Sequence, residues 1–188
     1  MAMLMDHLIS WMIAVPFLGI VLLAFVHGEE SIRRIAFGIT MVEFFLSLIL
    51  WRSFDFTLQS MQFVERVEWM PTFNIQYAVG VDGISILLVI LTALLCPLCV
   101  LCSWTGITSR VRAYLSLILL VEGAMIVVFT ALDLFLFFML WEIIMIPMYF
   151  MIILWGGPNR IAAGTKFVLY SLTGSLLMLV GILGLYLN

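Results

Sequence analysis

The sequence predicts an all-α polytopic membrane protein with six transmembrane helices. Of its 188 residues, 65% are hydrophobic and only 10% are charged, and the mean hydropathy is +1.27. A soluble domain of this size needs a polar exterior, so a single core could not hide this much apolar surface. The apolar residues also gather into six runs of about 20 residues, which is the length of a helix that crosses the hydrocarbon core.

The six expected helices follow one another with mostly short connections. We place them near residues 7–27, 32–52, 84–104, 113–131, 133–155 and 161–187. No Lys or Arg precedes the first apolar run and no clear small-residue cleavage site follows it, so we expect a transmembrane helix there rather than a removable signal peptide. Asp133, in the very short turn before the fifth helix, is expected to cap that helix.

The only long connection covers residues 53–83. Near its end, apolar side chains from Ile75 to Val81 alternate with smaller or polar ones that begin at Asn74. This period of two predicts a strand-like segment that lies against the membrane face. Asp82 stands directly before the third helix, where an N-cap is wanted.

The arginines predict how the helices are oriented. Three loops expected on one side of the membrane carry Arg33 with Arg34, Arg110 with Arg112, and Arg160. The opposite side has two arginines against five acidic residues. By the positive-inside rule, the three basic loops face the cytoplasm or its organellar equivalent, so both ends of this chain face outward.

Four charged residues fall inside the expected helices and away from the helix ends: Glu43, Glu122, Glu142 and Lys166. Charges at such depth usually face a bundle interior or a hydrated cavity. Glu142 lies in the apolar run MLWEIIMIPMYF, and Lys166 is the only lysine of the chain. We therefore take Glu142 as the main candidate for proton transfer, Lys166 as a candidate relay and Glu122 as a candidate supporting acid.

The chemistry of such a site follows from desolvation. Burial favours the neutral forms of a carboxyl group and of an amine, whereas a nearby opposite charge favours the charged forms. Pro147 leaves the carbonyl of Ile143 without its helical partner, and that oxygen could bind water beside Glu142. At about 1.5 Å per residue, Glu142 lies about 20 Å and Lys166 about 8 Å from the cytoplasmic end, so we expect a water-bridged relay rather than a direct ion pair.

The same residues also have structural explanations, which remain open. Lys166 can snorkel to the cytoplasmic surface, and Glu43 can meet a partner chain or lie neutral against a neighbouring helix. The three cysteines of CPLCVLC are similar in spacing to the start of an iron–sulfur run, but the chain lacks a fourth thiolate, so we expect them to pack as small hydrophobic residues. With no Gly-rich phosphate loop either, we expect no metal and no other cofactor on this chain.

Three stretches resemble the antiporter-like subunit M of bacterial NADH:quinone oxidoreductase, whose mitochondrial counterpart is chain 4 of respiratory complex I. They are VGVDGISILLVILT (79–92), ALDLFLFFMLWEIIMIPMYFMIILWGG (131–157) and TKFVLYSLTGSLLMLVGILGLY (165–186). The WE-x4-P-M-Y arrangement, followed by WGGPNR and TKF-x-LY, is specific for this subunit. The sister subunits L and N and the Mrp-type antiporters share the buried glutamate but differ around it.

The resemblance implies the N-terminal part of a fourteen-helix antiporter-like fold. Residues 1–104 would be its N-terminal three-helix group, with the connection 53–83 facing outward, and residues 105–188 the first three helices of an incomplete five-helix proton-channel repeat. Glu142 matches the essential glutamate of the fifth helix. Helices seven to fourteen, with the lysines that continue the proton path, would come from a second polypeptide or from the C-terminal part of a longer product.

The resemblance further implies a proton-translocating membrane-arm subunit of the enzyme NADH:quinone oxidoreductase, which couples NADH oxidation and quinone reduction to proton pumping. Flavin, iron–sulfur clusters and quinone would lie on partner subunits. The partners would be other membrane-arm subunits, including L and N, and the lipid bilayer, with no nucleic acid. A bacterial plasma membrane is favoured over a mitochondrial inner membrane. Two alternatives remain open: a subunit of an Mrp-type cation/proton antiporter or antiporter-like hydrogenase module, and a truncated structural or assembly subunit.

Overall fold

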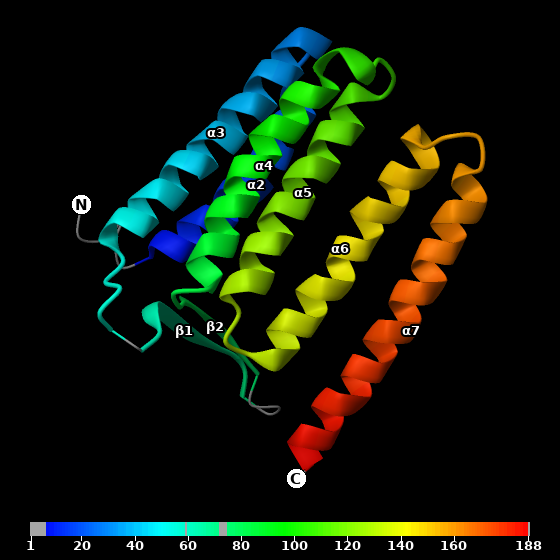
Figure 1. Cartoon of the computed structure of the whole chain (residues 1–188). Coiled ribbons are helices and arrows are strands. Elements are labelled where there is room, and N and C mark those ends of the chain that lie inside the picture. Colours follow the sequence, from blue (N-terminus) through cyan, green and yellow to red (C-terminus); the bar gives the residue numbers. More distant parts are fainter. Residues whose placement is uncertain (1–6, 59, 72–74, 188) are drawn as a thin grey trace.

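Six long helices and one β-hairpin make up the computed structural model, which describes residues 7–58, 60–71 and 75–187. The elements are α2 (Leu8–Phe25), α3 (Glu29–Ser53), β1 (Gln62–Met70), β2 (Ile75–Val81), α4 (Ser85–Gly106), α5 (Val111–Thr130), α6 (Leu134–Trp155) and α7 (Arg160–Leu187) (Figure 1). All six helices are long and apolar enough to cross a membrane. The prediction of six transmembrane helices is therefore confirmed, and the hairpin is an addition to it.

The helices pack as a four-helix bundle with two further helices at its side. Helices α2 to α5 surround a common core, α6 lies along α5, and α7 lies along α6 at the edge of the molecule (Figure 1). More than half of the apolar stretch of α5 is buried, against 6% of that of α7. The sequence makes this possible because most side chains are apolar and can face either lipid or protein.

Aspartate carboxylates accept backbone hydrogen bonds at the N-terminal ends of two helices, α6 and α4. Oδ1 of Asp133 accepts hydrogen bonds from the backbone N–H groups of Phe135 and Leu136, both at 2.9 Å, which confirms the cap predicted for α6. Oδ1 of Asp82 accepts from the N–H groups of Ser85 (2.6 Å) and Ile84 (3.0 Å), although the N-cap position of α4 is Ile84 rather than Asp82 as predicted. These bonds, that from Ser85 foremost, lower the pKa of Asp82. Their stabilisation is present above the ordinary pKa of a carboxyl group and is lost as pH falls through the lowered value.

The hairpin lies across the helix ends on the side where α4 begins (Figure 1). Its strands are antiparallel, with Gln62 opposite Val81 and Met70 opposite Ile75. The predicted strand is β2, which is confirmed from Ile75 onward, while Asn74 lies outside the described residues. The sequence did not predict β1. The three charged residues in QFVERVEWM obscure the alternation of buried and exposed side chains that marks a strand, because only one of them, Glu65, is buried.

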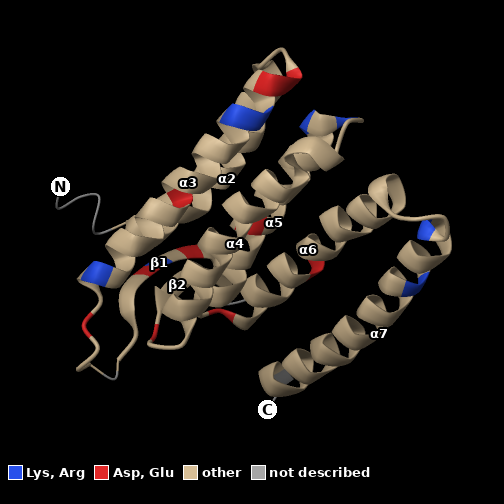
Figure 2. Cartoon of the chain, turned by 45° about the horizontal axis from the view of Figure 1, so that its top comes forward, with Lys and Arg blue, Asp and Glu red and all other residues tan. Residues whose placement is uncertain are grey.

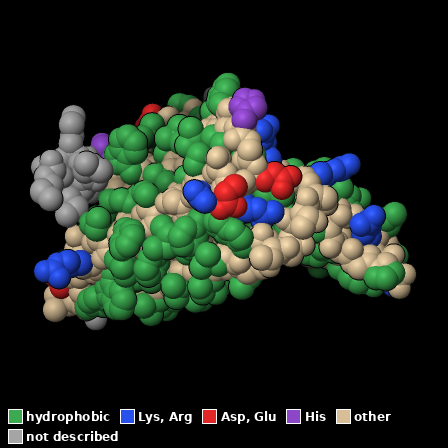
Figure 3. Space-filling view, turned by 90° about the horizontal axis from the view of Figure 1, so that it is seen from above, with side chains coloured by type: hydrophobic (Ala, Val, Ile, Leu, Met, Phe, Trp, Pro, Cys, Tyr) green, Lys and Arg blue, Asp and Glu red, His purple; other side chains and the backbone are tan. Residues whose placement is uncertain are grey.

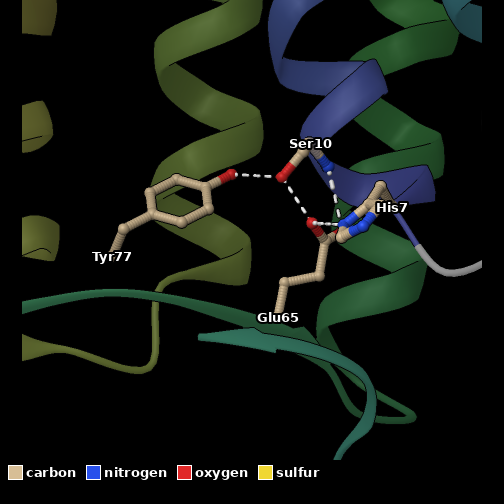
Figure 4. A network of polar contacts seen from close by, with 4 residues as sticks. All are labelled: His7, Ser10, Glu65 and Tyr77. Carbon is tan, nitrogen blue, oxygen red and sulfur yellow. Dashed lines mark hydrogen bonds and ion pairs between the residues drawn. The ribbon is translucent and has the colours of Figure 1, made fainter. Parts of the chain in front are cut away.

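Glu65 fixes the hairpin to the start of α2 (Figure 4). Its carboxylate, in a residue that is only 7% exposed, accepts hydrogen bonds from the N–H group (3.1 Å) and the hydroxyl of Ser10 and lies 3.2 Å from Nδ1 of His7. The Ser10 hydroxyl also shares a hydrogen bond of 2.8 Å with the hydroxyl of Tyr77. Burial raises the pKa of Tyr77, and the nearby Glu65 adds to the rise, while the bond with Ser10 opposes it. One carboxylate thus connects α2, β1 and β2.

The opposite end of the molecule collects the basic loops. Arg33, which is buried, donates to the backbone oxygens of Ser103 (3.4 Å) and Ile107, and Arg112 donates to the backbone oxygen of Val26 (2.6 Å). The blue residues of the three loops lie at one end in Figure 2, and charged side chains gather near the middle of that end in Figure 3. The shared side of the three loops therefore agrees with the prediction from the arginines, while the assignment of that side to the cytoplasm stays a prediction.

We expect Glu65→Ala to loosen the hairpin. The change leaves the N–H group and the hydroxyl of Ser10 without their acceptor, at a cost of about 1–3 kcal/mol in local stability. Backbone hydrogen exchange of β1 and β2 should therefore accelerate. The matched control is Glu68→Ala, on the exposed face of the same strand, which should leave exchange unchanged. Equal exchange in both variants would contradict the anchoring role of Glu65.

Candidate functional site

Glu142 lies on a cleft of about 600 Å³ between α6 and α7. The side chain is partly buried, and its Oε1 atom is buried without a hydrogen-bond partner in the described part of the chain. An unpartnered carboxyl oxygen among apolar groups is costly, so this side chain does not stabilise the fold. The other residues that line the cleft are Ile143, Met145, Ile146 and Tyr149 of α6 and Thr165, Val168 and Leu169 of α7.

A residue with a freed backbone carbonyl lies on the same cleft. Pro147 is buried within α6, and because it has no N–H group it cannot bond the carbonyl of Ile143. Ile143 lines the cleft, as Glu142 does. The structure therefore places the predicted acid and Ile143 on one cleft, while the binding of water by the freed carbonyl stays a prediction.

A close approach of α6 and α7 sets the width of the cleft. Gly164 is buried, and a Cβ atom added to it would lie 2.6 Å from Cγ2 of Ile153 and 3.2 Å from Cε2 of Tyr149. A larger residue would fit only after a shift of the Ile153 side chain or of one helix. Because Tyr149 also lines the cleft, the contact fixes the α6 wall relative to α7.

Lys166 is not brought to this cleft. It is exposed, and it does not line the cleft although its neighbour Thr165 does. No ion pair joins it to Glu142 within the described residues. The small and partly polar face that it shares with Ala162, Ala163, Tyr170 and Thr173 is exposed along its length.

Glu122 belongs to a different group of residues. It is 0% exposed on α5 and does not line the cleft of Glu142. Its nearest titratable neighbours are instead Glu43 of α3, also 0% exposed, and the thiol of Cys96 of α4. The sequence did not predict that Glu43 and Glu122 lie together.

One feature of the sequence does indicate that Glu43 faces the protein interior. Thr40, Glu43 and Ser47 are spaced to lie on one face of a helix, and all three are buried.

The three cysteines do not converge. Cys96 is buried, whereas Cys99 and Cys102 are exposed on other faces of α4. Within the described ranges, no three Cys, His or acidic side chains come together as they would around a metal ion. The donor set present does not fit an iron–sulfur cluster, which needs four converging ligands.

Comparison with known protein families decides the relationship. Residues 10–130 match the model of the amino terminus of NADH-ubiquinone oxidoreductase chain 4. The chain belongs to this family. Residues 131–188 match the transmembrane model shared by NADH:quinone oxidoreductase and the Mrp antiporter. The two matches cover the bundle α2 to α5 and the pair α6 and α7 in turn, and they confirm the family predicted from the three motif stretches.

Curated relatives agree with this assignment. The chain is 42% identical over 178 residues to NADH-ubiquinone oxidoreductase chain 4 of Arabidopsis thaliana, covering 93% of this chain and 36% of the relative. It is 40% identical over 188 residues to NADH-quinone oxidoreductase subunit M of Rhodobacter capsulatus, covering 97% and 36%. A third relative, 36% identical over 177 residues with coverage of 94% and 36%, is F(420)H(2) dehydrogenase subunit M of Methanosarcina mazei.

A solved structure confirms the fold. A chain of respiratory complex I from Thermus thermophilus superimposes with a TM-score of 0.79 at 29% identity, covering 94% of this chain and 35% of that one. The chain therefore spans about a third of the length of the relatives it matches. The fold prediction, a six-helix N-terminal part of an antiporter-like subunit, is confirmed.

We expect Gly164→Ala to destabilise the protein, whereas alanine in place of a helical glycine usually stabilises. The added methyl group meets Ile153 and Tyr149 and should cost about 1–3 kcal/mol of unfolding free energy. Gly181 is the matched control on α7, because a Cβ atom there meets nothing within 4 Å, so Gly181→Ala should gain up to about 1 kcal/mol. Unfolding of the purified protein in detergent measures both. A gain in both variants would contradict the close contact.

Proposed function

We propose that this chain is a proton-translocating membrane-arm subunit of NADH:quinone oxidoreductase, and that Glu142 carries the proton. The observation that carries the proposal is the position of Glu142 on the cleft between α6 and α7, with a buried unpartnered oxygen and with Ile143, whose carbonyl Pro147 frees, lining the same cleft. Membership of the chain 4 family and the names of the curated relatives support the choice of enzyme.

The cleft suits a group that gains and loses a proton. Its lining is mostly apolar, so an ionised carboxylate there requires water or a neighbouring positive charge. Water held by the free carbonyl of Ile143 would accept the proton of Glu142 and return it. The arrival and departure of positive charge near the cleft would then determine when Glu142 is loaded.

We keep Lys166 as the candidate relay and Glu122 as the candidate supporting acid. Lys166 directly follows Thr165, which lines the cleft, but Lys166 itself is exposed and does not line it, so it needs intervening water or further groups to act on Glu142. Glu122 lies on the helix packed against α6 and acts on the site through that contact.

The wider assignment follows the family. We assign residues 1–104 to the N-terminal three-helix group and 105–188 to the first proton-channel repeat. Flavin, iron–sulfur clusters and quinone would reside on partner subunits, and the L and N subunits would be neighbours in an energy-coupling membrane. The relatives' names and the complex I match support these assignments.

Cation/proton antiport without electron transfer is the second candidate. The family model over residues 131–188 describes both NADH:quinone oxidoreductase and the Mrp antiporter. Affinity purification of the chain from its native membrane separates the two: a complex that oxidises NADH supports the first proposal, and a complex without any redox subunit supports antiport.

We expect Glu142→Gln to reduce NADH-driven proton pumping by about tenfold or more, because the amide cannot exchange a proton and a positioned acid or base contributes factors of this size. Acidification of inverted membrane vesicles, followed with a pH-sensitive dye, measures pumping, and NADH oxidation by an artificial acceptor reports assembly. The matched control is Glu68→Gln, an exposed acid of β1. Wild-type pumping by Glu142→Gln would refute the assigned role.

We expect Pro147→Ala to slow pumping while leaving Glu142 in place. Alanine supplies the missing N–H group, so the carbonyl of Ile143 regains its helical hydrogen bond and no longer binds water. The same vesicle assay measures the effect. An unchanged pumping rate with a fully assembled complex would rule out a role for the free carbonyl.

A further inference from the structure

A second acidic site lies inside the bundle of α2 to α5, away from the cleft of Glu142. Glu43 of α3 and Glu122 of α5 are both 0% exposed and lie close enough to interact electrostatically, with the thiol of Cys96 of α4 beside both. In Figure 2 an acidic band stands near the middle of α3 and of α5. None of the four carboxyl oxygens has a hydrogen-bond partner among the described residues.

Two prolines place free backbone acceptors around this pair. Pro97 directly follows Cys96 in α4 and frees the carbonyl of Ala93. Pro16 of α2 packs on Gly123, the residue after Glu122, where an added Cβ atom would lie 3.3 Å from Cβ of Pro16. Pro16 in turn frees the carbonyl of Met12. Both freed carbonyls belong to fully or almost fully buried residues, Ala93 one turn before Cys96 on α4 and Met12 one turn before Pro16 on α2.

The helices packed around the pair bring no compensating positive charge within the described residues. Helix α2 contains no titratable side chain, and α4 contributes only cysteines. The one arginine of α5, Arg112, bonds the carbonyl of Val26 at the loop end. On α3, Arg33 bonds the end of α4, Arg34 pairs with Glu30 at the exposed start of the helix, and Arg52 is exposed at the far end.

The protonation of the pair follows from these surroundings. An isolated ionised carboxylate in an apolar medium is very costly, and two neighbouring carboxylates cannot both ionise without a counter-charge. One ionised and one protonated carboxyl group can share the remaining proton in a charge-assisted hydrogen bond. The pair is therefore able to hold two protons or one, but not none.

We propose that Glu43 and Glu122 form a second proton-binding site, separate from Glu142, which releases one of its two protons and retains the other. On release, one carboxyl O–H bond breaks and the proton passes to water. The retained carboxyl group and the thiol of Cys96 then donate hydrogen bonds to the carboxylate. The freed carbonyls of Met12 and Ala93 accept hydrogen bonds from the O–H groups, or hold the water, while both protons are present.

Infrared titration of the assembled complex in lipid vesicles tests this site. The background is Cys99→Ala/Cys102→Ala, which leaves Cys96 as the only thiol of the chain. Two signals are followed as pH rises: the carbonyl stretch of protonated carboxyl groups, assigned to the pair by subtraction of the Glu43→Gln/Glu122→Gln spectrum, and the S–H stretch of Cys96, assigned by subtraction of the Cys96→Ala spectrum.

We expect the carbonyl signal of the pair to fall to about half, and the S–H stretch to move to lower frequency at the same pH. Loss of the whole carbonyl signal, its absence at neutral pH, or no change in either signal over the pH range in which the protein stays folded would each overturn the proposal. The thiol signal requires no change to either glutamate, so it remains informative if the double variant fails to assemble.

Two further variants make the result specific. Thr40→Val removes a buried hydroxyl from the same stripe of α3, where it bonds only the carbonyl of Phe37, and should leave both signals in place. Glu142→Gln should also leave them in place. Failure of the pumping role of Glu142 and failure of the second site are therefore distinguished, because the first is read from pumping and the second from spectra that do not depend on it.

Discussion

The absence of water from the bilayer interior is the constraint on which this structure depends. Each backbone N–H and carbonyl group inside lipid must find its partner within the protein, so every described membrane-length segment is a helix, and the one pair of strands lies across the helix ends. The same constraint explains the arginines. Arg33 and Arg112 donate to backbone oxygens where helices end, among them the C-cap carbonyls of Ile107 and Val26.

In the described structure, the polar groups inside the membrane helices that lack a partner lie at defined places. Glu43, Glu122 and Glu142 each keep a buried carboxyl oxygen without a partner in the described structure, and the three prolines within helices each withdraw one N–H group from the ladder. The two kinds of exception coincide: Pro147 lies one turn from Glu142, Pro97 next to Cys96, and Pro16 against the residue after Glu122. Unpartnered acids near helix-interrupting prolines are the arrangement on which both proposed proton sites rest.

Much of this architecture could be predicted from the sequence, and there are physical reasons why strand β1 and the pairing of Glu43 with Glu122 could not. The length and apolarity of the six runs fixed the helices, and the acceptor geometry of Asp133 fixed the start of α6. Strand β1 was not predicted because charged residues obscure the alternation of apolar and polar side chains along it, and of these charged residues only Glu65 is buried. The pairing of Glu43 with Glu122 was not predicted because it depends on how α3 and α5 are rotated about their axes. In apolar helices, where either face can be buried, the sequence encodes that rotation only weakly.

The network of Glu65 has a consequence for biogenesis. The N–H group and the hydroxyl of Ser10, at the start of α2, are bonded by a residue that is synthesised 55 positions later. While the ribosome is still making α3, the first helix in the membrane therefore has an end whose polar groups lack their final partner. That end is completed only when the segment carrying Glu65 reaches the same side of the membrane as Ser10. A chain in which α3 fails to cross the membrane leaves Glu65 on the opposite side and cannot complete its own first helix.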